Sequence, residues 1–248
     1  ADRASRMITE IATTENFSRS VKIPHVDVLP ERDFAGKLAL TDLPAGQDVF
    51  YKIHFENLDD GRTSSEPVIG HFRTAPAAKR NIRFGWSGDT AGQGWGIDED
   101  RGGMKTYDTI TKHNPDFFIH SGDTIYADGP FAEQAKMPDG DMWKNIITED
   151  TGKVAETLNE FRGNYKYNML DKNVLEFNRL IPVYYQWDDH EVLNNWYPGE
   201  MLTGDDRYSE KSVSLMAARA NRAFREMLPI TEHATEPGRV YRKVSYGP

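Results

Sequence analysis

The chain has 248 residues and a formal net charge of −9, from 30 Lys and Arg residues against 39 Asp and Glu residues. An acidic surface repels the phosphate backbone of nucleic acids, so no nucleic-acid partner is expected. The chain contains no cysteine, which excludes disulfides, thiolate nucleophiles and cysteine-based zinc sites. Its hydrophobic fraction of 38% is enough for a sizeable core, and no stretch approaches the roughly 20 apolar residues of a transmembrane helix.

The first part of the chain has the pattern of short alternating strands. Strands are expected at residues 6–13, 37–40, 49–55 and 70–74, with turn-rich segments between them. This arrangement is typical of a small β-sandwich. Pro76 follows the last of these strands and cannot continue a strand ladder, so a linker is expected here. We therefore predict a β-sandwich domain over residues 1–77.

From residue 80 onward strands alternate with helices, which predicts an α/β domain over residues 78–248. The fold class of the whole chain is therefore α/β (α+β). The strands are expected at 81–86, 116–120 and 182–187, and the helices at 104–111, 154–161, 174–181 and 213–227.

A short local repeat carries most of the functional information. The tetrapeptide Ser-Gly-Asp-Thr occurs at 87–90 and again at 121–124, each time where a predicted strand ends. The third strand runs into Asp-Asp-His-Glu at 188–191. In open α/β sheets ligands bind beyond the carboxyl ends of the strands, so the acids of all three segments are expected at one edge.

Carboxylates gathered in this way repel one another unless a cation lies between them. Asp, His, Asn and Tyr donors suit Mg, Ca, Mn, Zn or Fe, and such a cluster supports two-metal hydrolysis of a phosphate ester. Tyr126 follows Asp123 by three residues and lies within reach of the same ion. His190 could hydrogen-bond a phosphate oxygen or protonate the leaving group.

Simpler interpretations apply to several of these residues taken alone. A single Gly-Asp pair after a strand is most often turn chemistry, and only the three strand ends together favour a metal site. His120 lies inside a strand and is expected to be a packed core residue, and Glu191 is expected to be structural. Asn194 is either a turn residue or an amide-oxygen ligand. Core packing is the default expectation for the tryptophans near the acidic loops, Trp86, Trp187 and Trp196.

Taken together, residues 84–89, 115–126 and 187–196 resemble the alkaline phosphatase D (PhoD-like) phosphatase/phosphodiesterase family. The motifs that carry the resemblance are Gly-Asp-Thr-Ile-Tyr and Trp-Asp-Asp-His-Glu. Residues 43–46 and 70–76 resemble that family's N-terminal fibronectin-type-III-like domain. The resemblance covers nearly the whole chain.

The resemblance implies a calcineurin-like metallophosphoesterase core, an αββα sandwich of two sheets flanked by helices. It also implies a di- or trinuclear metal centre, with Fe(III) and Ca favoured and Zn, Mn or Mg as alternatives. Asp123 would bridge the metals, Tyr126 would bind iron, and Asp189 would bind the second metal. The remaining site residues that the resemblance implies are the first-strand acid Asp89 and the phosphate-facing His190. Asn194 stays a candidate metal ligand on the ground of its amide oxygen alone.

Two features depart from the family pattern. Many members carry a cysteine ligand where this chain has Ser87, so either Asp89 takes over that role or the metal differs. The superfamily also takes His and Asp ligands from later strands, whereas this chain stops at Pro248. We therefore expect a fragment cut at both ends, with a catalytic domain incomplete at its C-terminus. The family resemblance implies a periplasmic, cell-surface or secreted protein.

The leading functional hypothesis is metal-dependent hydrolysis of small phosphate esters, monoesters or diesters, with Asp189 and His190 as catalytic residues. One alternative is a phospholipase-D-like phosphodiesterase. Another is a non-catalytic surface protein whose acidic loops are stiffened by Ca²⁺. Purple acid phosphatases also combine a fibronectin-like domain with a Gly-Asp-x-x-Tyr motif, but they expect Gly-Asn-His in the third motif, so they rank lower. The sequence does not predict an oligomeric state.

Overall fold

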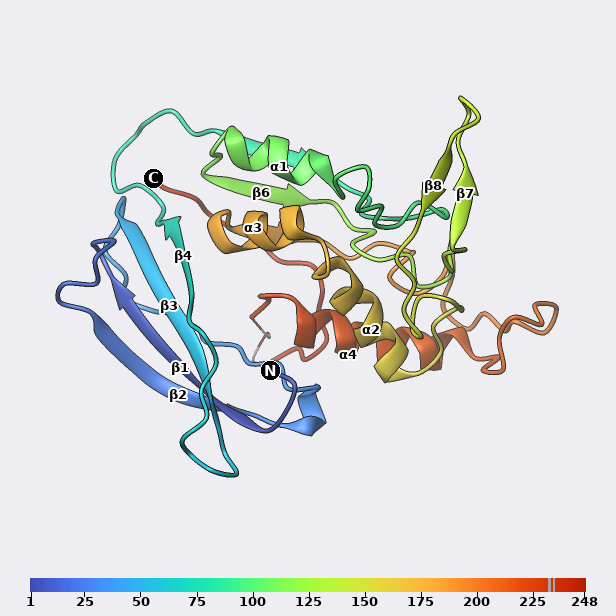
Figure 1. Ribbon diagram of the computed structural model, residues 1–248, viewed down its shortest axis with the longest axis horizontal. Coiled ribbons are helices and arrows are strands. Elements are labelled where there is room, and N and C mark those ends of the chain that lie inside the picture. The colour runs from blue at the N-terminus through green and yellow to red at the C-terminus, as the bar shows by residue number, and fades with distance from the viewer. Residues whose placement is uncertain (232, 234) are drawn as a thin grey trace. The chain divides into compact units, whose positions relative to one another are not determined.

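The structure is a computed structural model that describes residues 1–231, 233 and 235–248. Its tertiary contacts divide the chain into two compact units, and Figure 1 labels most of their strands and helices. Unit 1 contains residues 1–83 together with 179–182 and 242–248, and unit 2 contains residues 84–178 and 183–241. The chain thus passes from unit 1 to unit 2 between residues 83 and 84, and the later segments 179–182 and 242–248 belong to unit 1 again.

Unit 1 is built on one antiparallel sheet with the strand order β2-β1-β3-β4. The strands are β1 (Ser5–Ala12), β2 (Val21–Val28), β3 (Asp48–Asn57) and β4 (Val68–Arg73), and a 3₁₀ helix follows β2 at Pro30–Arg32. Buried and partly exposed residues alternate over most of β1, the period expected of a strand with one face in a core. The strands predicted around β1, β3 and β4 are confirmed.

The strand expected at residues 37–40 is wrong, and β2 was not expected. The segment after the 3₁₀ helix passes so close to the sheet that a Cβ atom on Gly36 would lie 2.7 Å from Val28 Cγ1 and 3.2 Å from Met7 Cε. It therefore packs against these side chains as irregular chain instead of pairing. β2 carries Pro24 in its middle, which an edge strand tolerates. The described strands of unit 1 form one sheet, so the fibronectin-type-III-like sandwich stays a prediction.

Unit 2 contains a parallel sheet with the strand order β5-β6-β9. Its strands are β5 (Phe84–Ser87), β6 (Phe117–His120) and β9 (Val183–Tyr185), close to where the sequence predicts them. Helix α1 (Lys105–Lys112) connects β5 to β6, and α2 (Leu158–Asn168) and α3 (Lys172–Leu180) lie between β6 and β9 in the chain. The carboxyl ends of the three strands therefore meet at one edge of the sheet.

The two faces of this sheet differ in burial. On one face Tyr107 of α1, Phe118 of β6 and Phe177 of α3 form an aromatic cluster, with ring centroids 4.9 and 5.4 Å from Phe177. On β5, Phe84 is 55% exposed and Trp86 is 72% exposed. Within the described residues of unit 2 the second sheet of an αββα sandwich is not seen, so that part of the architecture stays a prediction.

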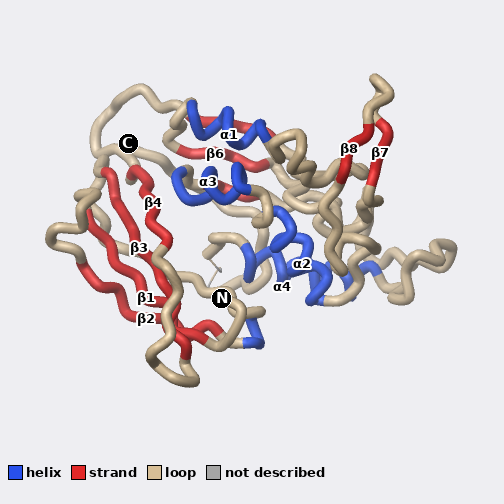
Figure 2. The backbone as a smooth tube through the Cα atoms, viewed as in Figure 1, coloured by secondary structure: helices blue, strands red, loops and turns tan. Residues whose placement is uncertain are grey.

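A hairpin outside the parallel sheet was not expected from the sequence. Strands β7 (Gln134–Lys136) and β8 (Met142–Lys144) pair in an antiparallel manner, and Gly140 turns the chain between them with φ +94°. Strands of three residues are too short to show an alternation of apolar and polar residues in the sequence. Figure 2 shows that long loops connect the hairpin to the rest of unit 2.

The main core of unit 2 lies between α2 and α4 (Val213–Met227). Helix α2 begins at Leu158, later than predicted, because Thr157 and Glu160 form a capping box at its N-terminus. The core also includes Ile125, Ala127, Val192 and Leu193 from the two loops that follow β6 and β9. Both loops are therefore anchored by buried apolar residues. No helix among the described residues is long and apolar enough to cross a membrane.

Candidate metal centre

The two Ser-Gly-Asp-Thr segments lie side by side beyond the ends of β5 and β6. The Asp89 backbone N–H donates to the Gly122 carbonyl oxygen at 3.2 Å, and the Thr90 N–H donates to the Asp123 carbonyl oxygen at 2.8 Å. Both aspartates adopt left-handed backbone conformations, with φ +61° at Asp89 and +52° at Asp123. The parallel ladder is thus continued past the strands, and the two acids occupy equivalent positions at the sheet edge.

Gly122 allows the third acidic segment to approach the second. Its φ is +102°, and an added Cβ would lie 2.4 Å from Asp188 Cβ and 3.0 Å from Asp188 N. Any larger residue would push the loop after β9 away from the loop after β6. The glycine before Asp123 is therefore required both for its backbone conformation and for this close contact.

Glu191 fixes the same two loops together. Its side chain is completely buried, and its carboxylate accepts hydrogen bonds from the backbone N–H groups of Thr124 at 2.6 Å, Asp188 at 2.7 Å and Asp123 at 3.2 Å. Burial raises the pKa of Glu191 to about 8, although the backbone hydrogen bonds oppose this shift. These contacts support the structural role expected for Glu191.

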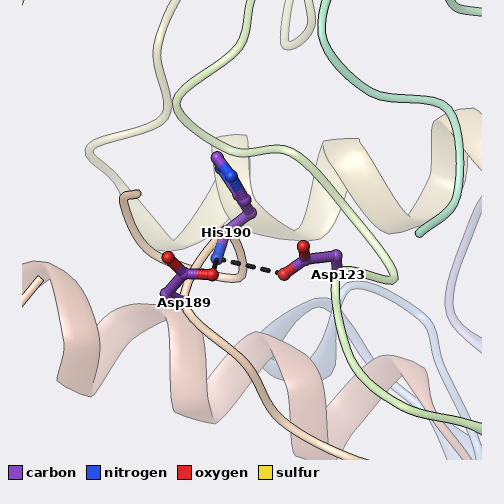
Figure 3. Close-up of side chains that lie close together, drawn as sticks. All are labelled: Asp123, Asp189 and His190. Carbon is purple, nitrogen blue, oxygen red and sulfur yellow. Dashed lines mark hydrogen bonds between the residues drawn. The ribbon is translucent and has the colours of Figure 1, made fainter. Parts of the chain in front are cut away.

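Three of the predicted site residues form a compact group of potential metal ligands. Ligand atoms of Asp123, Asp189 and His190 all lie within 4.8 Å of one another (Figure 3). The His190 backbone N–H contacts Asp123 Oδ1 at 3.3 Å and Asp189 Oδ1 at 3.1 Å. The strand ends after β6 and β9 are thus brought together, as the sequence predicts.

The electrostatics of this group show why a cation fits it. Burial and the nearby Asp89 side chain raise the pKa of Asp123 to about 6, and the charge of Asp189 acts in the same direction. Asp123 is therefore held in this group at a cost to its ionised form. Oxygen and imidazole donors suit hard or borderline cations. A bound cation would offset this repulsion.

Tyr126 completes the group on the β6 side. Its hydroxyl donates to Asp123 Oδ2 at 3.3 Å, and its ring stacks on the His190 ring with centroids 4.3 Å apart. Gly92 leaves room for the ring, because a Cβ there would lie 2.3 Å from it. Burial and the charges of Asp123 and Asp89 raise the pKa of Tyr126, so the phenol keeps its proton unless a cation replaces that proton.

Asp128 is a site residue that the sequence did not reveal. Its Oδ1 lies 2.7 Å from His190 Nδ1, and its Oδ2 accepts the Asn194 backbone N–H at 3.0 Å. Burial favours neutral His190, but Asp128 outweighs this effect and raises the pKa of His190. Asp128 leaves the Nε2 side of the imidazole available to a ligand. The sequence indicates Asp128 only as an acid five residues after Asp123. The Gly-Pro that follows it is typical of a turn, which favours interpreting Asp128 as a turn residue.

The other predicted residues lie around this group. Asn194 is exposed, and its backbone N–H is held by Asp128. Ser87 is exposed, with its hydroxyl 3.2 Å from the Gly88 carbonyl oxygen. His120 is 2% exposed, its Nε2 lies 2.7 Å from Thr90 Oγ1, and burial lowers its pKa to about 4. The prediction that His120 is a packed core residue is confirmed.

Of the tryptophans near the acidic loops, two follow the expectation of core packing. Trp187 and Trp196 pack against the main core of unit 2, and the Trp187 ring meets the Phe224 ring edge-on at 5.2 Å. Trp86 does not follow it, because the side chain is mostly exposed. Trp86 lies on the open face of the short parallel sheet, which accounts for the difference.

Comparisons with known proteins show the family of this chain. The family model for PhoD-like phosphatases matches residues 84–248, and the model for their N-terminal domain matches residues 1–76. The chain belongs to the PhoD-like phosphatase family. Alkaline phosphatase D of Bacillus subtilis (strain 168) is 25% identical over 199 residues. That match covers 79% of this chain and 31% of the relative, so the chain spans about a third of its length.

Two solved structures share the fold. A structure of PhoD matches with a TM-score of 0.74 and 21% identity, over 99% of this chain and 44% of that chain. A purple acid phosphatase from yellow lupin (Lupinus luteus) seeds matches with a TM-score of 0.53 and 14% identity, over 98% of this chain and 38% of that chain. At these identities the two matches show a common fold.

Proposed function

We propose that this chain carries metal-binding and phosphate-facing residues of a metal-dependent phosphoesterase that acts on phosphate monoesters and diesters. One observation carries the proposal: Asp123, Asp189 and His190 converge within 4.8 Å at the carboxyl ends of parallel strands. Membership of the PhoD-like phosphatase family supports it. The chain spans less than half of its relatives, so the activity is proposed for the whole protein to which these residues belong.

The proposed centre is di- or trinuclear, with Fe(III) and Ca favoured. Asp123 would bridge two ions, Tyr126 would bind iron, and Asp189 would bind the second metal. Asp89 would take the position at which many family members have cysteine, since its side chain lies near Asp123 and the Ser87 hydroxyl turns to its own loop. Asn194 would add an amide oxygen at the rim.

When bound, such metals lower the pKa of a coordinated water and neutralise the charge of the phosphate. The chain's own residues would then orient the ester and manage its protons. In hydrolysis the water oxygen would bond to phosphorus and lose a proton to solvent, the bond from phosphorus to the ester oxygen would break, and the leaving oxygen would take up a proton. His190, held at Nδ1 by Asp128, would supply that proton or hydrogen-bond a phosphate oxygen.

Asp123→Asn tests the proposal in the metal-loaded protein. Replacing this carboxylate removes the central charged ligand, so bound metal and phosphatase activity should both be lost. Asp139→Asn is the matched control, because Asp139 lies exposed in the β7–β8 turn. Full phosphatase activity in Asp123→Asn would overturn the proposal. Metal-dependent stability without turnover of any phosphoester would instead support the non-catalytic surface protein.

The preference between monoesters and diesters is tested by comparing rates on 4-nitrophenyl phosphate, its bis ester and phosphatidylcholine. Faster turnover of the monoester is expected of a phosphatase, and turnover restricted to phosphatidylcholine would favour the phospholipase-D-like alternative. By its family resemblance the protein is also proposed to be exported to the periplasm, the cell surface or the medium. Protease accessibility in intact cells tests that location.

A further inference from the structure

A pocket lies next to the candidate metal centre, and none of the functions assigned above uses it. It encloses about 490 Å³, within the range typical of small-molecule sites. Its lining includes residues 87–91, at the carboxyl end of β5, and residues 103–107, at the start of α1. Asp89 belongs to the first of these segments, and its side chain also interacts with Asp123. The pocket therefore shares Asp89 with the acid cluster.

The residues that line this pocket include two tryptophans. Trp95 and Trp143 form an edge-to-face pair with ring centroids 5.9 Å apart, and both line the space. The Trp143 indole N–H donates to the Gly96 carbonyl oxygen at 3.1 Å, which fixes that ring against the glycine-rich loop. Trp95 is 36% exposed, so part of its ring is available for contact. Aromatic faces of this kind stack on planar rings.

Two charged side chains line the pocket, Asp89 and Lys105, and they carry opposite charges. Lys105 is the one Lys or Arg among the residues that line it, and none of the described ion pairs involves its ammonium group. His120 also lines the pocket, and burial keeps it neutral by lowering its pKa to about 4. With a bound metal to offset the charge of Asp89, an anion entering this pocket would meet the positive charge of Lys105.

We propose that this pocket binds the ester substituent of the substrate and selects substituents that carry a planar aromatic ring, either an aryl group or a nucleobase. The inference rests on the proposed phosphoesterase function. With the phosphate at the acid cluster, the substituent extends past Asp89 between the start of α1 and the Trp95–Trp143 pair. Stacking on Trp95 supplies the selectivity, and Lys105 attracts the anion.

Trp95→Ala in the metal-loaded full chain tests the proposal with two matched substrate pairs. Phenyl phosphate is compared with ethyl phosphate, and adenosine 5′-monophosphate with ribose 5-phosphate, by release of inorganic phosphate. Loss of one stacking partner should lower kcat/KM about tenfold for the aromatic member of a pair and leave the other member nearly unchanged. A loss with phenyl phosphate alone identifies an aryl site, and a loss with the nucleotide alone identifies a nucleobase site.

Two variants separate stacking from damage to the fold. Trp95→Phe keeps a ring and should retain most of the aromatic preference. Trp86→Ala removes an exposed tryptophan that does not line the pocket and should leave the preference unchanged. Equal losses on all four substrates in Trp95→Ala, or no loss on any, would overturn the proposal.

Direct binding keeps the two proposals distinguishable. Phenyl phosphate is titrated into the metal-free chain, and its dissociation constant is read from tryptophan fluorescence. The pocket proposal expects this constant to rise about tenfold in Trp95→Ala and to stay constant in Trp86→Ala. If no phosphoester is hydrolysed but this difference is found, the proposed function fails and the pocket assignment stands. Equal dissociation constants in all three proteins would refute the pocket assignment.

Discussion

Removing the buried carboxylate of Glu191 should loosen the two loops that present the acid cluster. In Glu191→Ala the backbone N–H groups of Asp123 and Thr124 lose their acceptor, and both residues are buried. Each unsatisfied buried donor costs about 1–3 kcal/mol. Asp188 is exposed, so water can replace its bond. After the gain from removing a buried acid, we expect a net loss of about 2–4 kcal/mol in the free energy of unfolding.

The same substitution should also weaken metal binding, because Glu191 holds the loops of Asp123 and Asp189 at their mutual distance. Groups that orient metal ligands typically contribute about 10- to 100-fold in affinity. The expected fall in Mn²⁺ affinity is measured by titration with detection of the free ion. Hydrogen exchange at the Asp123 and Thr124 amides should accelerate in parallel.

Glu156→Ala provides a control for simple destabilisation. Glu156 is also buried, and its Oε1 accepts the backbone N–H groups of Ser209 at 2.5 Å and Glu210 at 2.6 Å, in loops that carry none of the candidate ligands. Its removal should lower stability but leave Mn²⁺ affinity unchanged. Unchanged affinity in Glu191→Ala, or an equal loss in Glu156→Ala, would refute the positioning role of Glu191.

Three further predictions follow from individual side chains of unit 2. Iron-loaded protein should absorb visible light through a phenolate-to-iron band, and Tyr126→Phe should lose it; a band that persists in the variant would remove Tyr126 as the iron ligand. Burial lowers the pKa of His120 to about 4 in the folded protein, against about 6.5 in the unfolded chain. Between these two pH values the unfolded state binds more protons than the folded state. The free energy of unfolding should therefore fall by up to about 3 kcal/mol as the pH drops from 6.5 to 4. His120→Gln should reduce that fall in urea unfolding, and identical pH dependence in both proteins would contradict the reasoning. Asp128→Asn should lower the pKa of His190 and move the alkaline limb of the kcat/KM profile to lower pH; an unmoved limb would show that Asp128 does not act on His190 in catalysis.

Local patterns predicted the elements that position the site. The parallel strands were visible as short apolar runs, and helix α4 as a long amphipathic stretch. The repeated Ser-Gly-Asp-Thr segment predicted that Asp89 and Asp123 would share one sheet edge, because both follow strands of one parallel sheet. These predictions depended on information within ten or fifteen residues of each position, which a single sequence contains.

Long-range partners were not predictable in the same way. Glu191 acts on backbone amides 67 and 68 residues earlier in the chain, and Asp128 acts on His190 62 residues later. Backbone donors have no residue identity, so no sequence motif announces that a carboxylate will bind them. The strand predicted at residues 37–40 was wrong for a related reason. Tertiary packing next to this segment, of Gly36 against Met7 and Val28, outweighed the local strand pattern.

Asp123 has two energetically unfavourable features that the fold does not require. Its backbone lies in the left-handed region at φ +52°, which disfavours side chains, and burial beside other acids raises its pKa to about 6. An asparagine or glycine would meet the backbone requirement without the charge. The net charge of −9 is therefore a weaker guide to the partners of this protein than the positions of its acidic residues. Acids concentrated at one sheet edge, held there by Gly122 and Glu191, favour a phosphate ligand once cations reverse the local field.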